Sequence, residues 1–379
     1  MATARPRKAK DAASGKDDFE NSILARLGDE YQQQCTEEEF TRDVAVFFCG
    51  MKRSGKTSLV ERFINPSKDD KDPPKPTVAL DYKFARYAAE TSSSKTLAHI
   101  FDLGGDEINE NLISLPVAPA NVASLVLVVT LDLSDPHHVV PCLENWLGIL
   151  RSQVVKSLDA LAKESPNAAR HVEAMKEATQ GAYAGHADEA SVRPFPVSLV
   201  IVGAKWDIFA AEADPEKRKN FCRALRYFAH VNGAWLLSSA KQDKVSMNNM
   251  RALLRQLLFG VASKGGLTEQ LDSAKPLCIS PGKDSLSAIG VPHGSHGGEQ
   301  AWRELCQSLF PDPQPAQKGK QRSAGEQVGD ELLKYPEGSV DGMVEQRVEE
   351  LNQYRRQVER NQRLASEGVD GSKITALSA

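Results

Sequence analysis

The stretch that decides the fold is Val44-Ala-Val-Phe-Phe-Cys49, followed directly by Gly50-Met-Lys-Arg-Ser-Gly-Lys-Thr57. The first part is apolar throughout, which favours a strand buried on both faces of a parallel sheet. The second part matches the pattern G-x-x-x-x-G-K-[ST], in which a glycine-rich turn between a strand and a helix binds phosphate oxygens. A helical stretch at 58–64 follows, so the motif stands in the setting that it requires. The sequence therefore predicts a phosphate-binding loop after the first strand.

Each residue type in this loop has a chemical role. Glycine lets the backbone turn so that N–H groups face a phosphate, and the following helix adds its positive N-terminal end. Lys56 can reach the β- and γ-phosphates, and the hydroxyl of Thr57 can bind Mg²⁺. We therefore predict one phosphate-binding set: Gly50, Met51, Lys52, Arg53, Ser54, Gly55, Lys56, Thr57 and Ser58.

Strand-like and helical stretches alternate along most of the chain. Strands are expected at 44–49, 77–88, 97–103, 123–131, 197–202 and 234–238, and helices at 58–64, 139–163, 214–231 and 247–259. Such alternation is typical of an α/β fold, here a mostly parallel six-stranded sheet flanked by helices. The long interval before residue 197 is interpreted as an insertion at about 164–193, with one or two further helices and a flexible excursion on the surface.

Three shorter motifs stand at the ends of expected strands. Asp102-Leu-Gly-Gly105 fits D-x-x-G, in which the aspartate holds Mg²⁺ through water and the glycine N–H senses a γ-phosphate. Ala204-Lys-Trp-Asp207 and Ser239-Ala-Lys241 stand where GTPases carry the base-recognition motifs N-K-x-D and S-A-K. This order predicts a Ras-like P-loop G domain. The candidates are Thr57 and Asp102 for Mg²⁺, Thr77 and Gly105 for the switch and γ-phosphate, and Lys205, Asp207, Ser239, Ala240 and Lys241 for the base.

Two residues depart from the GTPase pattern. Ala204 replaces the asparagine of N-K-x-D, and Asp106 stands where Ras-like GTPases usually carry the glutamine that orients the attacking water. A carboxylate there would lie close to a negatively charged phosphate group. We therefore expect a pseudo-GTPase that binds GTP or GDP (or ATP) with Mg²⁺, or whose site stays empty. The complete phosphate loop keeps an active Ras-like GTPase switch as the alternative.

Several longer stretches resemble the dynein light intermediate chains. They are Asp72-Pro-Pro-Lys-Pro-Thr-Val-Ala-Leu-Asp-Tyr82, His99-Ile-Phe-Asp-Leu-Gly-Gly105, Pro194-Phe-Pro-Val-Ser-Leu-Val-Ile-Val-Gly-Ala-Lys-Trp-Asp-Ile-Phe209, Glu216-Lys-Arg-Lys219, Leu225-Arg-Tyr-Phe-Ala-His230 and Lys275-Pro-Leu277. The similarity is closer to the ciliary class, that of cytoplasmic dynein 2, and covers about residues 43–310.

The resemblance implies a non-catalytic motor subunit. Its Ras-like domain would bind and stabilise the dynein heavy-chain tail for minus-end-directed retrograde intraflagellar transport. The implied partners are the heavy chain and the other dynein 2 and intraflagellar transport subunits, with two copies of this chain in each motor complex. The implied location is the cytoplasm, the cytoskeleton, the cilium or flagellum and the basal body.

The remaining residues are expected to be extensions of a single G domain at 43–260. They comprise a disordered arm at 1–42, a docking extension at 261–310, a linker at 311–339, an amphipathic helix at 340–365 and a disordered tail at 366–379. The docking extension is expected to end in a short helix near 301–310. The amphipathic helix carries an apolar stripe of Val344, Val348, Leu351, Tyr354 and Val358, for a partner protein or for the G domain itself.

Composition excludes several classes of protein. The 379 residues include 47 Lys and Arg against 51 Asp and Glu, a net charge of −4, so a nucleic-acid partner is not expected. The longest apolar run, 122–131, is too short to cross a membrane as a helix, and no secretory signal is expected. None of the six cysteines forms a C-x-x-C pair, so neither a disulfide framework nor a zinc site is expected.

Overall fold

The computed structural model describes residues 43–66, 74–88, 95–105, 110–241, 243–262, 267–292, 294, 297–311 and 338–366. The predicted arm at 1–42, nearly all of the linker and nearly all of the tail at 366–379 lie outside these residues, so those expectations stay predictions. The chain forms two units, Met1–Asp312 and Pro313–Ala379. The first contains the sheet, and the described residues of the second form one helix; each unit is described by itself.

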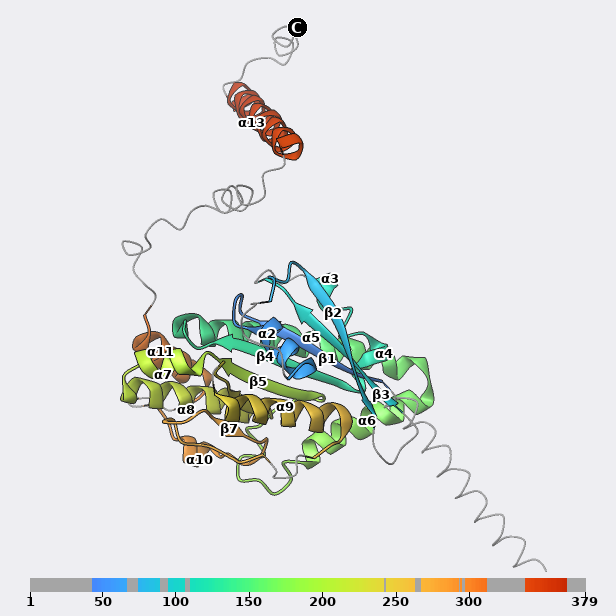
Figure 1. The fold of residues 1–379 in the computed structure, drawn as a ribbon, viewed down its shortest axis with the longest axis vertical. Coiled ribbons are helices and arrows are strands. Elements are labelled where there is room, and N and C mark those ends of the chain that lie inside the picture. Colours follow the sequence, from blue (N-terminus) through green and yellow to red (C-terminus); the bar gives the residue numbers. More distant parts are fainter. Residues whose placement is uncertain are drawn as a thin grey trace, which may run out of the picture. The chain divides into compact units, whose positions relative to one another are not determined.

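A seven-stranded sheet forms the centre of the first unit (Figure 1). Its order is β2-β3-β1-β4-β5-β6-β7. The strands are β1 Asp43–Gly50, β2 Leu80–Ala88, β3 Lys95–Leu103, β4 Leu125–Asp132, β5 Ser198–Ala204, β6 Trp235–Ser238 and β7 Cys278–Ile279. The strands from β3 to β6 pair in parallel, whereas β2 and β7 lie antiparallel at the two edges. The predicted mostly parallel sheet is confirmed, but it has one strand more than the six expected.

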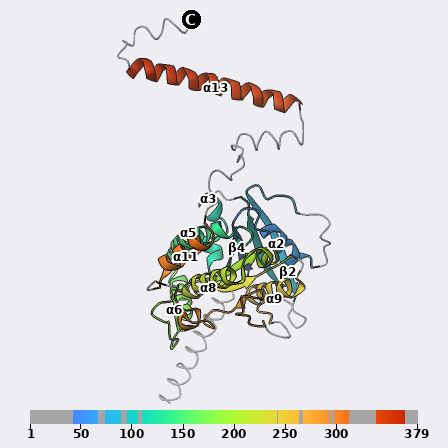
Figure 2. The same ribbon diagram turned by 90° about the vertical axis from the view of Figure 1, so that its left-hand side faces the viewer.

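Helices cover both faces of the sheet (Figure 2). Helices α2 (Lys56–Ile64) and α9 (Lys244–Phe259) pack on one face, and α5 (Pro136–Glu164) and α8 (Pro215–Val231) pack on the other. The other helices described in this unit are α3 Glu110–Ile113, α4 Pro119–Val122, α6 Pro166–Gly181, α7 Trp206–Glu212, α10 Leu286–Ile289 and α11 Glu299–Leu309. In the part of the chain that the structure describes, no helix is long and apolar enough to span a membrane.

The two faces explain why the central strands are apolar throughout. All eight residues of β4 are buried. Successive side chains of a strand point to opposite faces, so Phe47 and Leu127 join the cluster under α5 and α8. Phe48 and Val128 join the cluster under α2 and α9. A strand covered on one side only would alternate apolar and polar residues instead.

The insertion between β4 and β5 is built on the end of the long helix α5. Ser165 ends α5 and caps α6, because its hydroxyl accepts the backbone N–H of Ala168 at 3.1 Å, and Pro166 occupies the first turn. The turns that follow α6 were expected to form a flexible excursion. Instead, they carry Tyr183 and Val192 into buried positions. The insertion is therefore packed on the domain.

The extension after residue 260 is also part of the first unit. Strand β7 pairs with β6, and α11 packs on α5 and α8 with Trp302 and Cys306 buried. Helix α11, Glu299–Leu309, lies where the short helix near 301–310 is expected. Arg303 of this helix forms an ion pair with Glu144 of α5 at 2.8 Å. The extension therefore adds both the seventh strand and a helix to the domain.

The second unit holds α13, which runs from Gly338 to Ser366 and covers the residues of the expected amphipathic helix. Three residues of its predicted apolar stripe, Val348, Leu351 and Tyr354, are exposed, with Tyr354 at 67%. Large apolar side chains on one face of a helix are stabilised by packing against another surface.

Candidate nucleotide-binding site

The sheet brings the predicted motifs to a single edge. The four motifs begin at the carboxyl ends of β1, β3, β5 and β6, and these strands run in parallel. The register places Phe48 opposite Asp102, and Gly203 opposite Ser238. Ligands of such α/β folds bind outside the carboxyl ends of the strands. The topology therefore assembles one site from segments that lie far apart in the sequence.

The turn of the phosphate loop depends on its glycines. Gly50 has φ +124°, and a Cβ atom there would lie 2.1 Å from the backbone oxygen of Thr130 in the neighbouring strand. Gly55 has φ +93° and caps α2, and no side chain bonds to the helix N-terminus there. The N-terminal N–H groups of a helix attract anions when no side chain caps them. The loop therefore has the geometry of a phosphate site.

Lys56 lies at the centre of the loop. Its side chain is buried, and its ammonium group donates to the carbonyl oxygens of Gly50 at 3.2 Å and Met51 at 2.6 Å. Ser54 is also buried, and its hydroxyl donates to the same Met51 oxygen at 2.7 Å. Around them, Lys52 and Arg53 are exposed, whereas Thr57 and Ser58 are partly buried. A cation held at this point can bind phosphate oxygens without first having to be ordered.

Three side chains converge where a metal ion would bind. The Thr57 hydroxyl donates to Asp102 Oδ2 at 2.6 Å, and the Thr77 hydroxyl donates to the same oxygen at 3.2 Å. The two hydroxyl oxygens lie 3.0 Å apart. Asp102 Oδ1 is buried and has no hydrogen-bond partner. Burial raises the pKa of Asp102, against the opposing effects of the Thr57 hydrogen bond and the Lys56 charge.

These residues fit a bound Mg²⁺. Thr57 offers a hydroxyl ligand, and the unpartnered oxygen of Asp102 offers an acceptor for a water of the ion. A divalent cation would also add positive charge beside this buried carboxylate, where Lys56 does not offset the effect of burial on the pKa. The predicted metal pair and the switch candidate Thr77 therefore come together in the structure.

The γ-phosphate candidate lies beside the switch threonine. A Cβ atom at Gly104 would lie 2.1 Å from the backbone oxygen of Thr77, so this contact requires glycine. The Gly104 N–H donates to the Ala79 carbonyl at 2.6 Å, which fixes the approach of the two segments. Gly105 follows with φ +79°. Asp106, expected to hinder hydrolysis, lies outside the described residues.

On the base side, Lys205 is already bound by another group. It forms an ion pair with Asp132, the last residue of β4, and Asp132 is held in turn by the N–H and the hydroxyl of Ser134. Asp207 is exposed in the first turn of α7. Trp206 is buried against Phe209, with their ring centroids 5.8 Å apart, so it packs in the core and does not stack on a base.

The S-A-K segment is occupied as well. The N–H of the base candidate Ala240 donates to the hydroxyl of Ser246 at 3.2 Å. The Lys241 carbonyl accepts from Arg62 at 2.6 Å. Ser239 is buried, and its N–H donates to Gly203 at 2.8 Å. All five base candidates lie near one edge, but a guanine would have to displace existing contacts of at least Lys205 and Ala240.

Sequence reasoning missed three residues of this edge: Asp132, Ser246 and Arg62. Asp132 carried a usable signal, because it is a carboxylate directly after an apolar strand, as Asp102 is. Ser246 and Arg62 stand on helices among other polar residues, and nothing in the local sequence distinguishes them.

The fold, the phosphate loop and the strand-end motifs define a Ras-like P-loop G domain. The family "Ras of Complex, Roc, domain of DAPkinase" matches residues 45–161. The cytoplasmic dynein 2 light intermediate chain 1 of Rattus norvegicus is 34% identical over 322 residues, which cover 82% of this chain and 87% of the relative. That of Danio rerio is 33% identical over 340 residues, covering 87% of this chain and 90% of the relative.

A crystal structure of the conserved domain of a dynein light intermediate chain has the same fold. It matches with a TM-score of 0.51 at 14% identity, covering 72% of this chain and 99% of that one. The chain belongs to the cytoplasmic dynein 2 light intermediate chain family, as the resemblance of its motifs predicted.

Proposed function

We propose that this chain is a non-catalytic subunit that binds and stabilises the dynein 2 heavy-chain tail for minus-end-directed retrograde intraflagellar transport. The observation that carries the proposal is the extent of the family relationship, which covers 82% of the chain. We further propose two copies in each motor complex, contacts with other dynein 2 and intraflagellar transport subunits, and a location that includes the cilium or flagellum and the basal body.

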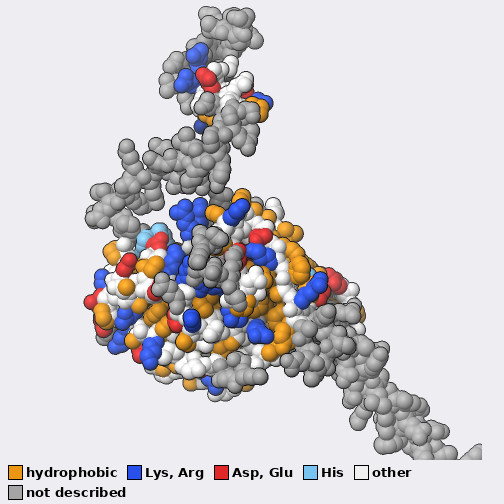
Figure 3. Space-filling model, in the orientation of Figure 1, with side chains coloured by type: hydrophobic (Ala, Val, Ile, Leu, Met, Phe, Trp, Pro, Cys, Tyr) orange, Lys and Arg blue, Asp and Glu red, His pale blue; other side chains and the backbone are white. Residues whose placement is uncertain are grey.

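An exposed apolar area at one sheet edge supports a protein partner. Strand β2 is an edge strand, and its exposed fractions are 50% for Tyr82 and 52% for Phe84; Val78, just before it, is 95% exposed. Figure 3 shows hydrophobic side chains gathered over this side of the domain. Arg86 lies over the Phe84 ring at 5.2 Å from its centroid. Apolar side chains grouped in this way are typical of protein–protein contact areas.

The base side supports a non-catalytic role. The contacts of Lys205 with Asp132 and of Ala240 with Ser246 satisfy these groups without a base. Selectivity for guanine depends on buried polar groups that only the correct base can satisfy. Because these groups already have partners, the domain can keep its fold without a nucleotide. We therefore propose a pseudo-GTPase whose phosphate side retains the ability to bind Mg²⁺ and phosphate.

Capture of the tagged chain from ciliated cells tests the subunit role. The dynein 2 heavy chain should be recovered with the wild-type chain. Phe84→Asp should lower that recovery at least about tenfold if β2 forms part of the contact, because it places a charge in an apolar interface. Val245→Asp is the matched control, since Val245 is 67% exposed on α9. Recovery of the wild-type chain without any heavy chain would reject the proposal.

An active GTPase switch is the second candidate. The convergence of Thr57, Thr77 and Asp102 beside a complete phosphate loop favours it. In that case freshly purified protein should release GTP or GDP on denaturation, and it should turn over added GTP. Lys56→Ala removes the buried cation and should abolish turnover. Equal rates for the wild-type and Lys56→Ala proteins would show that the measured turnover does not come from this site.

A further inference from the structure

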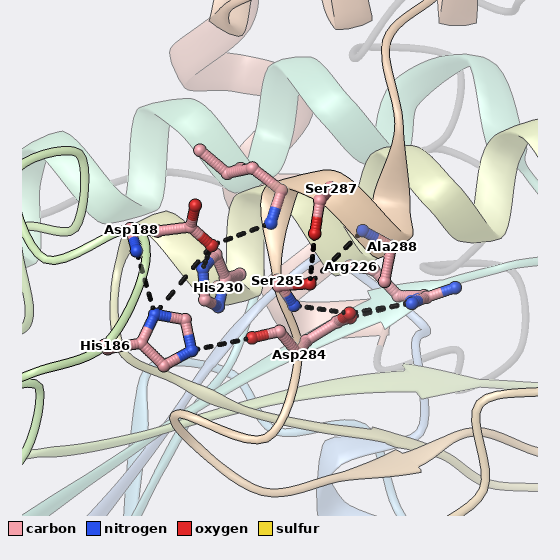
Figure 4. A network of polar contacts seen from close by, with 9 residues as sticks. His186, Asp188, Arg226, His230, Asp284, Ser285, Ser287 and Ala288 are labelled. Carbon is pink, nitrogen blue, oxygen red and sulfur yellow. Dashed lines mark hydrogen bonds and ion pairs between the residues drawn. The ribbon is translucent and has the colours of Figure 1, made fainter.

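Away from the nucleotide-binding edge, two histidines and an aspartate meet between distant segments (Figure 4). His186 and Asp188 lie in the turns after α6, and His230 lies in the last turn of α8. His230 Nε2 is 3.0 Å from Asp188 Oδ2, and His186 Nδ1 is 3.8 Å from the same oxygen. The three donor atoms all lie within 4.8 Å of one another. His230 is buried, and the other two residues are partly buried.

We propose that His186, Asp188 and His230 form a Zn²⁺ site. Atoms separated by 3.0, 3.8 and at most 4.8 Å share a common point. That point lies about 2.4 Å or less from each atom, close to the roughly 2.0–2.2 Å of zinc bonds to imidazole nitrogen and carboxylate oxygen. Shifts of a few tenths of an ångström in these three atoms would therefore bring all of them to bonding distance of one zinc ion. Two imidazoles and one carboxylate suit zinc better than Mg²⁺ or Ca²⁺, which prefer oxygen ligands.

The surrounding hydrogen bonds orient two of the ligands. His186 Nε2 lies 3.1 Å from the backbone oxygen of Asp284, which requires the proton on Nε2 and leaves the lone pair on Nδ1. Metal-binding histidines usually donate their second N–H to a carbonyl or carboxylate in this way. Asp188 Oδ2 also accepts the Leu286 N–H at 2.8 Å, which fixes the carboxylate.

The metal-free state uses the same atoms in hydrogen bonds. The Asp188 N–H donates to His186 Nδ1 at 3.1 Å, and His230 Nε2 lies within hydrogen-bond distance of the Asp188 carboxylate. His230 Nδ1 is then buried without a partner. Zinc binding would replace both hydrogen bonds and move the ring proton of His230 to Nδ1. A cavity of about 10 Å³ borders His230, close to the volume that one water needs, and a water there would accept a hydrogen bond from the Nδ1–H group.

Such an ion would join three parts of the chain. Its ligands belong to the insertion and to α8, and their hydrogen bonds reach residues 284–286 of the extension. A metal that binds only the folded state stabilises it in proportion to the logarithm of the metal concentration. The site would therefore act as a structural clamp. Its ligands are histidines and an aspartate far apart in the sequence, so cysteine spacing could not indicate them.

Metal analysis of the full-length chain, purified without a metal-affinity tag, tests the proposal. One equivalent of zinc per chain is expected. Added Zn²⁺ should raise the unfolding temperature by roughly 3–5 °C for each tenfold excess over the dissociation constant. His186→Gln keeps a donor for the Asp284 oxygen but removes the imidazole ligand, so it should lose both effects.

A second cluster provides a matched control. Asp135, His137 and His138 have the same composition, but His138 is exposed. His137→Gln should leave zinc content and its stabilising effect unchanged. Zinc lost from His137→Gln and retained by His186→Gln would overturn the assignment. Titration of the metal-free wild-type chain with Co²⁺ gives a separate readout that does not depend on variant folding. One saturable equivalent with the visible absorption of tetrahedral Co²⁺ supports the site, and no saturable binding overturns it.

Discussion

The ion pair that fixes the extension to α8 allows a quantitative prediction. Arg226 donates to Asp284 through two nitrogens, Nε to Oδ2 and Nη2 to Oδ1, each at 2.7 Å. The Arg226 and Asp284 side chains are only 12% and 4% exposed, so water solvates neither charge well. The carboxylate also accepts the Ser285 N–H at 2.9 Å. Asp284→Ala removes all three bonds and leaves the guanidinium group in a largely buried position without a counter-charge.

The cost follows from the burial of the arginine. Removing one partner of a buried pair typically costs about 3–5 kcal/mol in free energy of unfolding, and the loss of the hydrogen bond from the Ser285 N–H adds about 1 kcal/mol. Because Arg226 keeps slight contact with solvent, we expect the cost of breaking the pair to lie at the lower end of this range, about 3 kcal/mol. The total loss in free energy of unfolding is then about 4 kcal/mol. For a domain of this size the unfolding temperature should fall by roughly 8–16 °C.

Thermal unfolding followed by far-ultraviolet circular dichroism, with a chelator present, measures this loss. The control is Glu350→Ala in α13, where Arg347 and Glu350 form a pair that is 84% and 51% exposed. That change should cost less than about 0.5 kcal/mol. The double variant Arg226→Met/Asp284→Leu should recover most of the stability, because no buried charge remains. A loss for Asp284→Ala no larger than that of Glu350→Ala, or no recovery in the double variant, would refute the reasoning.

Three further predictions follow from glycine geometry, thiol burial and one carboxylate. Gly104→Ala should cost about 1–3 kcal/mol of unfolding free energy because its Cβ would lie 2.1 Å from a backbone oxygen. At Gly148 in α5 an added Cβ would meet no neighbouring atom within 4 Å, so Gly148→Ala should raise the free energy of unfolding by about 0.5–1 kcal/mol. Equal changes in unfolding temperature for Gly104→Ala and Gly148→Ala would contradict both expectations. Burial raises the pKa of Cys222 and of Cys306 to about 12, so a thiol reagent at neutral pH should label these two residues only after unfolding. Peptide mapping that finds either residue labelled in the native protein would contradict this. Burial also raises the pKa of Asp102 in the folded protein above that in the unfolded chain. The stability that the Asp102 carboxyl group contributes is therefore complete below its pKa in the unfolded chain, and it is lost as the pH rises through its pKa in the folded protein. Asp102→Asn should remove this loss in Mg²⁺-free thermal unfolding measured from acid to neutral pH, and an unchanged pH dependence would count against it.

The phosphate side of the site could be predicted because its residues are local. Gly50 and Thr57 belong to one short motif between a strand and a helix, and the parallel sheet fixes where Asp102 must lie. The base side could not be predicted in the same way. Whether Lys205 faces a base or Asp132 depends on the pairing of β4 with β5, and the motif does not show this. The position of Ser246 depends on how α9 packs on the sheet.

Most helices and central strands could be predicted from their hydrophobic patterns. Strand β7 and the packed turns after α6 could not. Strand β7 has only two residues, Cys278–Ile279, which is too short for an alternating pattern. The turns after α6 contain small and polar residues, which are typical of a mobile loop. They are ordered instead by Tyr183, by Val192 and by the contacts of Asp188 with His230, which involve residues far along the chain.

The packing of the extension has a genetic consequence. The Trp302 ring lies 5.9 Å from the ring of Tyr227, and Phe310 lies 5.3 Å from Phe221, so the last described residues of this unit cover α8. A premature stop codon anywhere between positions 261 and 301 would therefore expose a large aromatic area of the domain in addition to removing its C-terminal residues. We expect such alleles to yield little soluble subunit, and therefore to behave like alleles that produce no protein.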